Sequence, residues 1–168
     1  MDTIKITMMA IIGIVAIAIS LIVTQLFLRL AKSKSEKEGK INLAYSVLFS
    51  TWLIAFSFPY TSALSILNEY IDTVYKANLV SPLENIIKAT VFFIGLTNTW
   101  VIIWHFITKV FSVLFVGKRN DINEIECNHF TYFLMRGVVL ISFISCLMPV
   151  FETILRGFLP NILIPYYR

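Results

Sequence analysis

The stretch INLAYSVLFSTWLIAFSFPYTSALSILN, residues 41–68, runs for 28 residues without a charged side chain. The hydrocarbon core of a bilayer is about 30 Å thick, and about 20 apolar residues in an α-helix cross it. A helix also satisfies its own backbone hydrogen bonds, as a lipid environment requires. The stretch therefore predicts a membrane-spanning helix. Pro59 lies inside it, where the missing N–H and the ring predict a kink.

The composition of the whole chain is that of a membrane protein. Of the 168 residues, 58% are hydrophobic and only 14% are charged, against roughly 25% charged in soluble domains. The mean hydropathy is +0.80. Several spans of about 20 residues each leave no room for a separate soluble domain. We therefore expect an all-α, polytopic integral membrane protein with a single transmembrane domain over residues 1–168.

Another uncharged run, residues 6–28, precedes this span. Positive charge follows the run rather than preceding it, so we expect an uncleaved membrane anchor rather than a signal peptide. After the central span, Ser81, Pro82 and Glu84 have the spacing of a capping box with proline in the first helical turn. This pattern predicts a third helix that continues to about residue 116, where the sequence GKRND ends it.

The fourth predicted span is the weakest. Only residues 137–151 are uncharged, so the segment crosses the bilayer only if Arg136 and Glu152 lie at opposite edges or extend their polar groups to the interface. Pro149 predicts a kink in it. The sequence thus predicts four transmembrane helices arranged as two helical hairpins, with spans at about residues 4–30, 42–67, 85–111 and 132–155.

Lys and Arg concentrate in two of the connections. Residues 29–40 hold five basic against two acidic side chains, and Lys118 and Arg119 follow the third span. By the positive-inside rule, loops 31–41 and 117–130 face the cytosol and both termini lie outside, an N-out/C-out topology. The expected location is a cell membrane, the bacterial inner membrane. The basic residues expected to contact lipid headgroups or a cytosolic partner, rather than nucleic acid, are Arg29, Lys32, Lys34, Lys37, Lys40, Lys109, Lys118 and Arg119.

The third span carries a polar face. Asn98, His105 and Lys109 are separated by seven and four residues, so they share one side of a helix. The span centres near Asn98, which places Lys109 about 16 Å from the midplane, at the interface, and His105 about 10 Å from it. The predicted intramembrane face comprises Thr97, Asn98, Thr99 and His105. Interhelical hydrogen bonding is the favoured interpretation, and the lining of an ion path is the alternative.

Other candidate sites are few. Glu152 and Arg156 have the spacing of a helical ion pair, expected at the outer membrane edge. The segment NEIECNHF, residues 123–130, collects Glu, Cys and His side chains but lacks the spacing of a zinc site, so we expect no metal. Neither a phosphate-binding glycine loop nor a catalytic triad is recognisable. We expect no enzyme activity and no cofactor.

The leading functional hypothesis is a non-enzymatic, homo-oligomeric membrane subunit. It would act as a sensor, scaffold or anchor, in a bacterial envelope or defence system, and its basic loops would dock a cytosolic or membrane protein partner. One alternative is a small channel or membrane-permeabilising effector whose pore is lined by polar faces of the second and third helices. Another is an accessory subunit of a respiratory or secretion complex.

Overall fold

The computed structural model describes residues 2–37, 40–77 and 81–159, and almost all of these are helical. The all-α class is therefore confirmed. A single antiparallel pair of two-residue strands, β1 (Glu36–Lys37) and β2 (Lys40–Ile41), interrupts the helices in this part of the chain. The helices are α1 (Asp2–Ser35), α2 (Leu43–Lys76), α3 (Pro82–Val116), α4 (Asp121–Glu126), α5 (Phe130–Cys146) and α6 (Met148–Phe158).

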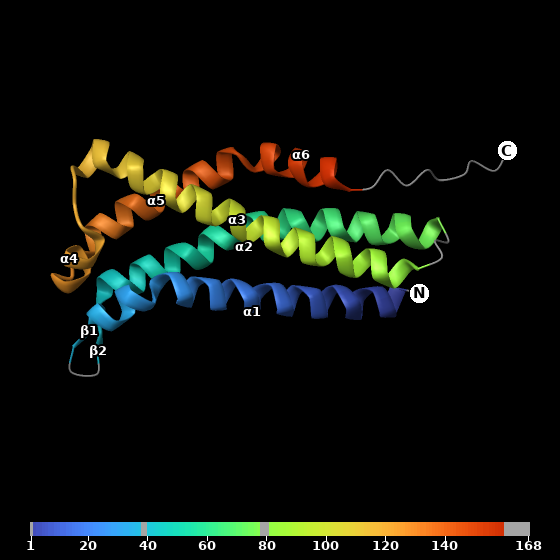
Figure 1. Ribbon diagram of the computed structural model, residues 1–168, viewed down its shortest axis with the longest axis horizontal. Coiled ribbons are helices and arrows are strands. Elements are labelled where there is room, and N and C mark those ends of the chain that lie inside the picture. The colour runs from blue at the N-terminus through green and yellow to red at the C-terminus, as the bar shows by residue number, and fades with distance from the viewer. Residues whose placement is uncertain (1, 38–39, 78–80, 160–168) are drawn as a thin grey trace.

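The long helices run side by side along the longest axis of the molecule (Figure 1). The β1–β2 hairpin and α4 lie together at one end, which we call the hairpin end. The start of α1, the end of α2, the start of α3 and the end of α6 lie toward the other, which we call the N-terminal end. Consecutive long helices are therefore antiparallel, as the two predicted helical hairpins require.

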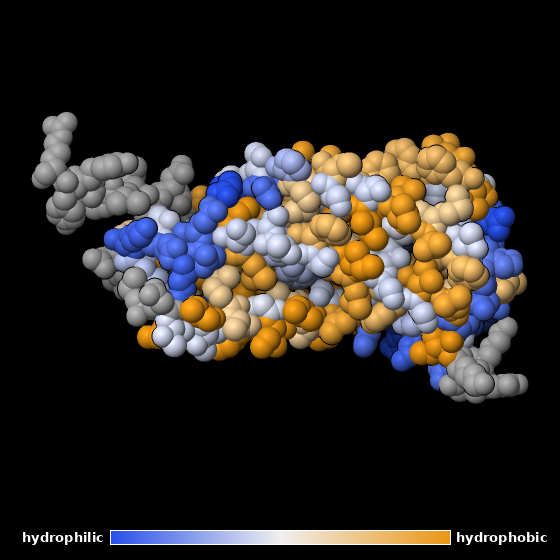
Figure 2. Space-filling view, turned by 180° about the vertical axis from the view of Figure 1, so that it is seen from behind, coloured by the Kyte–Doolittle hydropathy of each residue, from blue (hydrophilic) through white to orange (hydrophobic). Residues whose placement is uncertain are grey.

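Three helices are long and apolar enough to cross a membrane: α1, α2 and α3. The pair α5 and α6 passes the same test together but is bent by 50° at its break, so it counts as a fourth span only if both helices are taken as one. On the face drawn in Figure 2, apolar side chains cover much of the middle of the molecule, and hydrophilic side chains gather toward both ends. This distribution fits a membrane protein.

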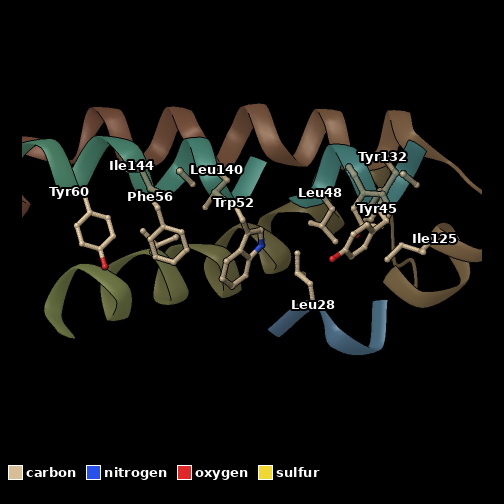
Figure 3. Close-up of a cluster of buried hydrophobic side chains, with 14 of the residues drawn as sticks. Leu28, Tyr45, Leu48, Trp52, Phe56, Tyr60, Ile125, Tyr132, Leu140 and Ile144 are labelled. Atoms are coloured by element: carbon tan, nitrogen blue, oxygen red, sulfur yellow. The ribbon is translucent and has the colours of Figure 1, made fainter. Parts of the chain in front are cut away.

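Helix α2 is at the centre of the packing. It contacts α1, α3, α5 and α6, and one side of it is buried along its whole length. Toward the hairpin end, the fully buried Trp52 lies in a cluster with Leu28, Leu48 and Ile144 (Figure 3). Toward the N-terminal end, Ile71 and its neighbours on α2 pack against α3 and α6 in a second cluster. The long side chains on α1 are by contrast mostly exposed.

The two prolines that predict kinks, Pro59 and Pro149, have different consequences for their helices. Helix α2 is continuous across Pro59. In the fourth predicted span the helix stops at Cys146 and restarts at Met148, with Pro149 in the first turn of α6. Proline fits the first turn of a helix because the N–H groups there have no intrahelical acceptor.

The ends of α3 lie where the sequence places them. The helix starts at Pro82, directly after the N-cap residue Ser81, and ends before Gly117, whose φ of 78° favours glycine. The predicted capping box is absent, however. The Ser81 side chain makes no capping hydrogen bond, and Glu84 binds Lys88 at 2.6 Å one turn further along the helix.

Candidate functional site

The polar face of α3 divides into two parts with different surroundings. Near the middle of α3, the level we call mid-depth, Asn98 is 7% exposed and donates hydrogen bonds to the Tyr60 hydroxyl and to the Ile94 carbonyl, both at 2.7 Å. Its Oδ1 is buried without a partner among the described residues. Asn98 therefore packs against α2.

The two threonines beside Asn98 point in opposite directions. Thr97 is buried and donates to the Phe93 carbonyl, whereas Thr99 is exposed on the outer side of α3 and donates to the Gly95 carbonyl. Both hydroxyls thus bond to their own helix. Of the four residues predicted to form one intramembrane face, only Thr97 and Asn98 share the buried side at this depth.

Nearer the hairpin end, the polar face of α3 meets charged residues from α4 and α5. Asp121 Oδ2 accepts from Lys109 Nζ at 2.8 Å and from Arg136 Nη1 at 3.0 Å, and Asp121 Oδ1 accepts from the Tyr132 hydroxyl at 2.9 Å. Arg136 Nη2 also donates to His105 Nε2 at 3.1 Å. We call His105, Lys109, Asp121, Tyr132 and Arg136 the Asp121 cluster.

Arg136 lies inside the bundle, in contrast to the sequence-based expectation. The sequence places it at the edge of the fourth span, but its residue exposure is 4%. A buried guanidinium requires several acceptors, and Asp121 and His105 supply them. The charge is thus accommodated by pairing inside the protein rather than by extension into the headgroup region.

The electrostatics of Asp121 follow from its two cationic neighbours. Burial by itself would raise the pKa of Asp121, but the charge of Arg136 and the hydrogen bonds from Lys109 and Arg136 lower that pKa below its ordinary value. Asp121 is therefore an anion at neutral pH. The two cations exceed its single negative charge, so the cluster carries net positive charge when His105 is neutral.

A close approach of two helices positions Arg136. The next residue, Gly137, faces Thr51 of α2, and a Cβ at position 137 would lie 2.5 Å from Thr51 Oγ1 and 2.8 Å from Thr51 Cγ2. Only glycine leaves room for this contact. Small residues of this kind let the backbones of membrane helices approach closely. The contact brings the middle of α5 against α2 and holds the Arg136 side chain over α3.

A cavity of about 270 Å³ lies beside the Asp121 cluster. Five helices line it, and its wall includes His105, Lys109, Asp121 and Arg136 together with the apolar residues Leu28, Leu48 and Phe106. Trp52 also lines it, with its ring centroid 4.6 Å from that of His105. The Trp52 indole N–H is buried without a hydrogen-bond partner in the described part of the chain.

The two predicted cytosolic loops bind each other at the hairpin end. Asn42, the N-cap of α2, donates a short hydrogen bond from its side chain to the Ile125 carbonyl of α4. The Ala44 amide donates to Asn128 Oδ1 at 3.0 Å, and Asn128 has a φ of 55°, in the left-handed region that asparagine tolerates. Lys34 and Glu126 pair at 3.0 Å. This end is consequently a folded unit.

These contacts use some of the cations of the predicted basic surface and leave others without an ion pair. Lys34, Lys109 and Arg119 form ion pairs with Glu126, Asp121 and Glu124. The side chains of Lys37 and Lys40 lie outside the described part of the structure. Within this predicted surface, the cations that are exposed and make no described ion pair are Arg29, Lys32 and Lys118.

The outer ion pair differs from the prediction. Arg156 binds Glu69 of α2, with Nη1 to Oε2 at 2.7 Å, rather than Glu152 on its own helix. Glu152 accepts instead from Ser62 of α2 at 2.7 Å. Helix α6 packs along α2, so both side chains reach polar groups across the interface that a spacing rule within one helix does not consider.

The segment 123–130 comprises the last four residues of α4, the turn after it and the first residue of α5. His129 Nδ1 and Arg119 both contact Glu124, at 2.8 and 3.3 Å. In the part of the chain that the structure describes, no three His, Cys, Asp or Glu side chains converge on a metal position. Cys127 and Cys146 are free and exposed.

Sequence reasoning missed Asp121, Tyr132 and Trp52 as members of a site. One signal was present: Arg136 interrupts an apolar segment and therefore needs a nearby acid. Asp121 is the acid that packing supplies, 15 residues earlier in the chain. Comparisons of the chain with family models, with curated proteins and with solved structures find no match.

Proposed function

We propose that this protein is a non-enzymatic membrane subunit with four spans that anchors a protein partner at its hairpin end. On this proposal α5 and α6 together make the fourth span, the hairpin end lies in the cytosol, and both termini lie outside. The membrane is the bacterial inner membrane. The observation that carries the proposal is a folded, basic hairpin end with exposed cations that are not used in ion pairs.

The charge distribution supports this orientation. Residues 29–40 and 109–136, which belong to the hairpin end, contain nine basic and five acidic side chains. Residues 69–88, which form the connection at the N-terminal end, contain two basic and three acidic side chains. An excess of Lys and Arg in short loops marks the cytosolic side of a membrane protein.

The folded hairpin end supports partner binding. Contacts among α1, α2 and α4 order this surface, so a partner need not order it on binding. Arg29, Lys32 and Lys118 present positive charge there. An acidic surface on the partner would complement them.

A pore through one copy of the chain has less support. Asn98, the polar residue at mid-depth, is closed against Tyr60 of α2. The exposed apolar side chains of α1, including Ile11, Ile14 and Ile17 at 57 to 68% exposure, are available to lipid or to a second copy of the chain. Self-association of the subunit through α1 is therefore part of the proposal.

Cysteine labelling tests the orientation. In a Cys146→Ser variant, Cys127 at the hairpin end should react with a membrane-impermeant maleimide only after the cells are opened. In a chain without native cysteines, Lys76→Cys at the N-terminal end should react in intact cells. Labelling of Cys127 from outside intact cells contradicts the proposed topology.

Charge reversal tests the docking surface. The triple variant Arg29→Glu, Lys32→Glu and Lys118→Glu should lose its co-purifying partner, identified by mass spectrometry, while its thermal unfolding midpoint stays unchanged. Lys76→Glu changes an exposed cation at the opposite end and should retain the partner. Equal recovery of the partner with both variants contradicts docking at the hairpin end.

A further inference from the structure

The cavity beside the Asp121 cluster has two kinds of surface. One part is charged and polar, from Arg136, Lys109, Asp121 and His105. The other part is apolar, from side chains of α1, α2 and α3. A site that combines apolar walls with a few convergent polar groups is the usual form of a binding site for a small amphiphilic molecule.

The polar part of the cavity has hydrogen-bonding capacity that the protein does not use. The residue exposure of Trp52 is 0%, and its indole N–H has no partner among the described residues. Figure 3 shows that the indole nitrogen lies on the side of the ring that faces Leu28 and Leu48, both of which line the cavity. An unpaired buried N–H is costly, so an acceptor in the cavity would stabilise it.

The net charge of the cavity wall determines whether a negatively charged acceptor group is favoured there. Lys109 and Arg136 carry two positive charges, and Asp121 is the one carboxylate in the lining. Arg136 is 4% exposed, so its charge acts at low dielectric and little water screens it. An anionic group is therefore favoured over a neutral or cationic one.

The entrance of the cavity indicates where the ligand comes from. The rim includes Phe27, Leu30 and Phe106, which are 45, 59 and 53% exposed, on the surfaces of α1 and α3. Lys109 lies at the same rim, with its side chain 49% exposed. Exposed apolar side chains on spanning helices face lipid tails, and a lysine near the end of a span lies at headgroup level.

We infer that this cavity binds the phosphate headgroup of an anionic membrane lipid. The Trp52 N–H and the Arg136 and Lys109 side chains recognise the phosphate, and Phe27, Leu30 and Phe106 contact the acyl chains outside. None of the exposed cations assigned to partner docking lines the cavity. The lipid site therefore stands or fails separately from the docking surface.

Lipid titration tests the inference. Purified, delipidated protein is titrated with dioleoylphosphatidylglycerol, with dioleoylphosphatidylcholine and with inorganic phosphate, and bound lipid is measured by native mass spectrometry. Phosphatidylglycerol should bind at least about tenfold more tightly than phosphatidylcholine, because both lipids carry the phosphate but the choline of the latter adds a positive charge that Lys109 and Arg136 repel. Equal affinity for the two lipids overturns the inference. Inorganic phosphate that binds as tightly as phosphatidylglycerol overturns the lipid as the source of the phosphate.

The matched variants are Trp52→Phe and Trp104→Phe. Both remove a buried indole N–H that has no described partner, but Trp104 stacks on Phe143, away from the cavity lining. Trp52→Phe should weaken phosphatidylglycerol binding by about tenfold, whereas Trp104→Phe should bind like the parent protein. Equal binding by both variants overturns the assignment.

A second variant keeps the test valid if Trp52→Phe does not fold. Lys109→Gln removes a charge from the rim at a half-exposed position, which tolerates substitution. It should also weaken phosphatidylglycerol binding while leaving phosphatidylcholine binding unchanged. Unchanged phosphatidylglycerol binding by folded Lys109→Gln overturns the role of the charged rim.

Discussion

The middle of α3 and its hairpin-end portion both place polar side chains on the same helix, yet these side chains have different environments. Asn98 donates to one polar side chain, the Tyr60 hydroxyl, and to the Ile94 carbonyl of its own helix. Lys109 and His105 instead meet an acid from α4 and an arginine from α5, beside a cavity. The first is a packing contact, and the second is an electrostatic site.

The difference between these regions comes from the helices opposite them. At mid-depth the side chain opposite Asn98 belongs to the continuous helix α2. At the hairpin end, α3 stops at Val116 and the chain returns through α4, which places the Asp121 carboxylate against α3 and α5. Polar residues at helical spacing therefore mark one face of a helix, and the residues that meet that face decide its chemistry.

Of the four changes that follow, removal of Arg136 should lower the free energy of unfolding the most. Loss of one partner from a buried ion pair costs about 3 to 5 kcal/mol, so we expect Arg136→Met to lower the free energy of unfolding by about 3 kcal/mol. Unfolding in detergent, followed by circular dichroism, measures this. Arg156→Met removes the exposed pair with Glu69 and should leave the unfolding midpoint unchanged. Equal midpoints for the two variants would contradict the assignment of Arg136 as a buried structural charge.

Disturbing the close contact between Gly137 and Thr51 should have the second largest effect on the free energy of unfolding. Gly137→Ala places a methyl group against Thr51 and should destabilise the fold by about 2 kcal/mol, the scale of overpacking in a dense core. Adding Thr51→Ala removes the two nearest atoms and should restore most of the loss. Gly95→Ala, which meets nothing within 4 Å, is the control and should not destabilise. Failure of Thr51→Ala to restore stability would show that the contact is not the cause.

The contribution of Asp121 should depend on pH. Its folded pKa lies below the ordinary value of 3.8, so its stabilising effect is complete above that value and is lost as pH falls through the folded pKa. Asp121→Asn should therefore lower the free energy of unfolding by about 1.5 kcal/mol at neutral pH. The gap between variant and parent should stay constant down to about pH 5 and close in stronger acid. A gap that grows with acidity would reverse the assigned sign.

Loss of the contact between Asn98 and Tyr60 should have the smallest effect on the free energy of unfolding. Asn98→Leu removes the hydrogen bond to Tyr60 and should cost less than about 1 kcal/mol, because interhelical hydrogen bonds in membranes average about 0.6 kcal/mol. The same change also removes the unpaired Oδ1. Thr99→Val at the exposed side of the same turn is the control. A loss as large as that of Arg136→Met would remove the distinction between the two regions.

Local features of the sequence predicted much of the helical framework. Pro82 begins α3, and Gly117 follows its last residue. These boundaries depend on backbone chemistry within a few residues, where proline lacks an N–H and glycine tolerates positive φ. The predicted spans are shorter than the helices, since α1 continues to Ser35 and α2 to Lys76. Hydropathy locates the apolar part of a helix, and polar residues can continue the helix beyond it.

The candidate site was predictable only in part. The spacing of Asn98, His105 and Lys109 predicted a shared face of one helix, and the structure places Asn98 and the Asp121 cluster along it. The pairing of Arg156 with Glu69 and the burial of Arg136 were not predictable, because each depends on a residue from another helix. Spacing within one helix carries no information about the neighbouring one.

An all-helical chain with long apolar segments follows from the amino-acid sequence alone, because hydrophobic length and helix boundaries are local properties of the chain. The burial of Arg136 beside Asp121 and the position of Trp52 at a cavity follow instead from how the helices pack. These outcomes depend on the close approach of α5 to α2 at Gly137 and on the return of the chain through α4. Packing across helices sets which charges meet.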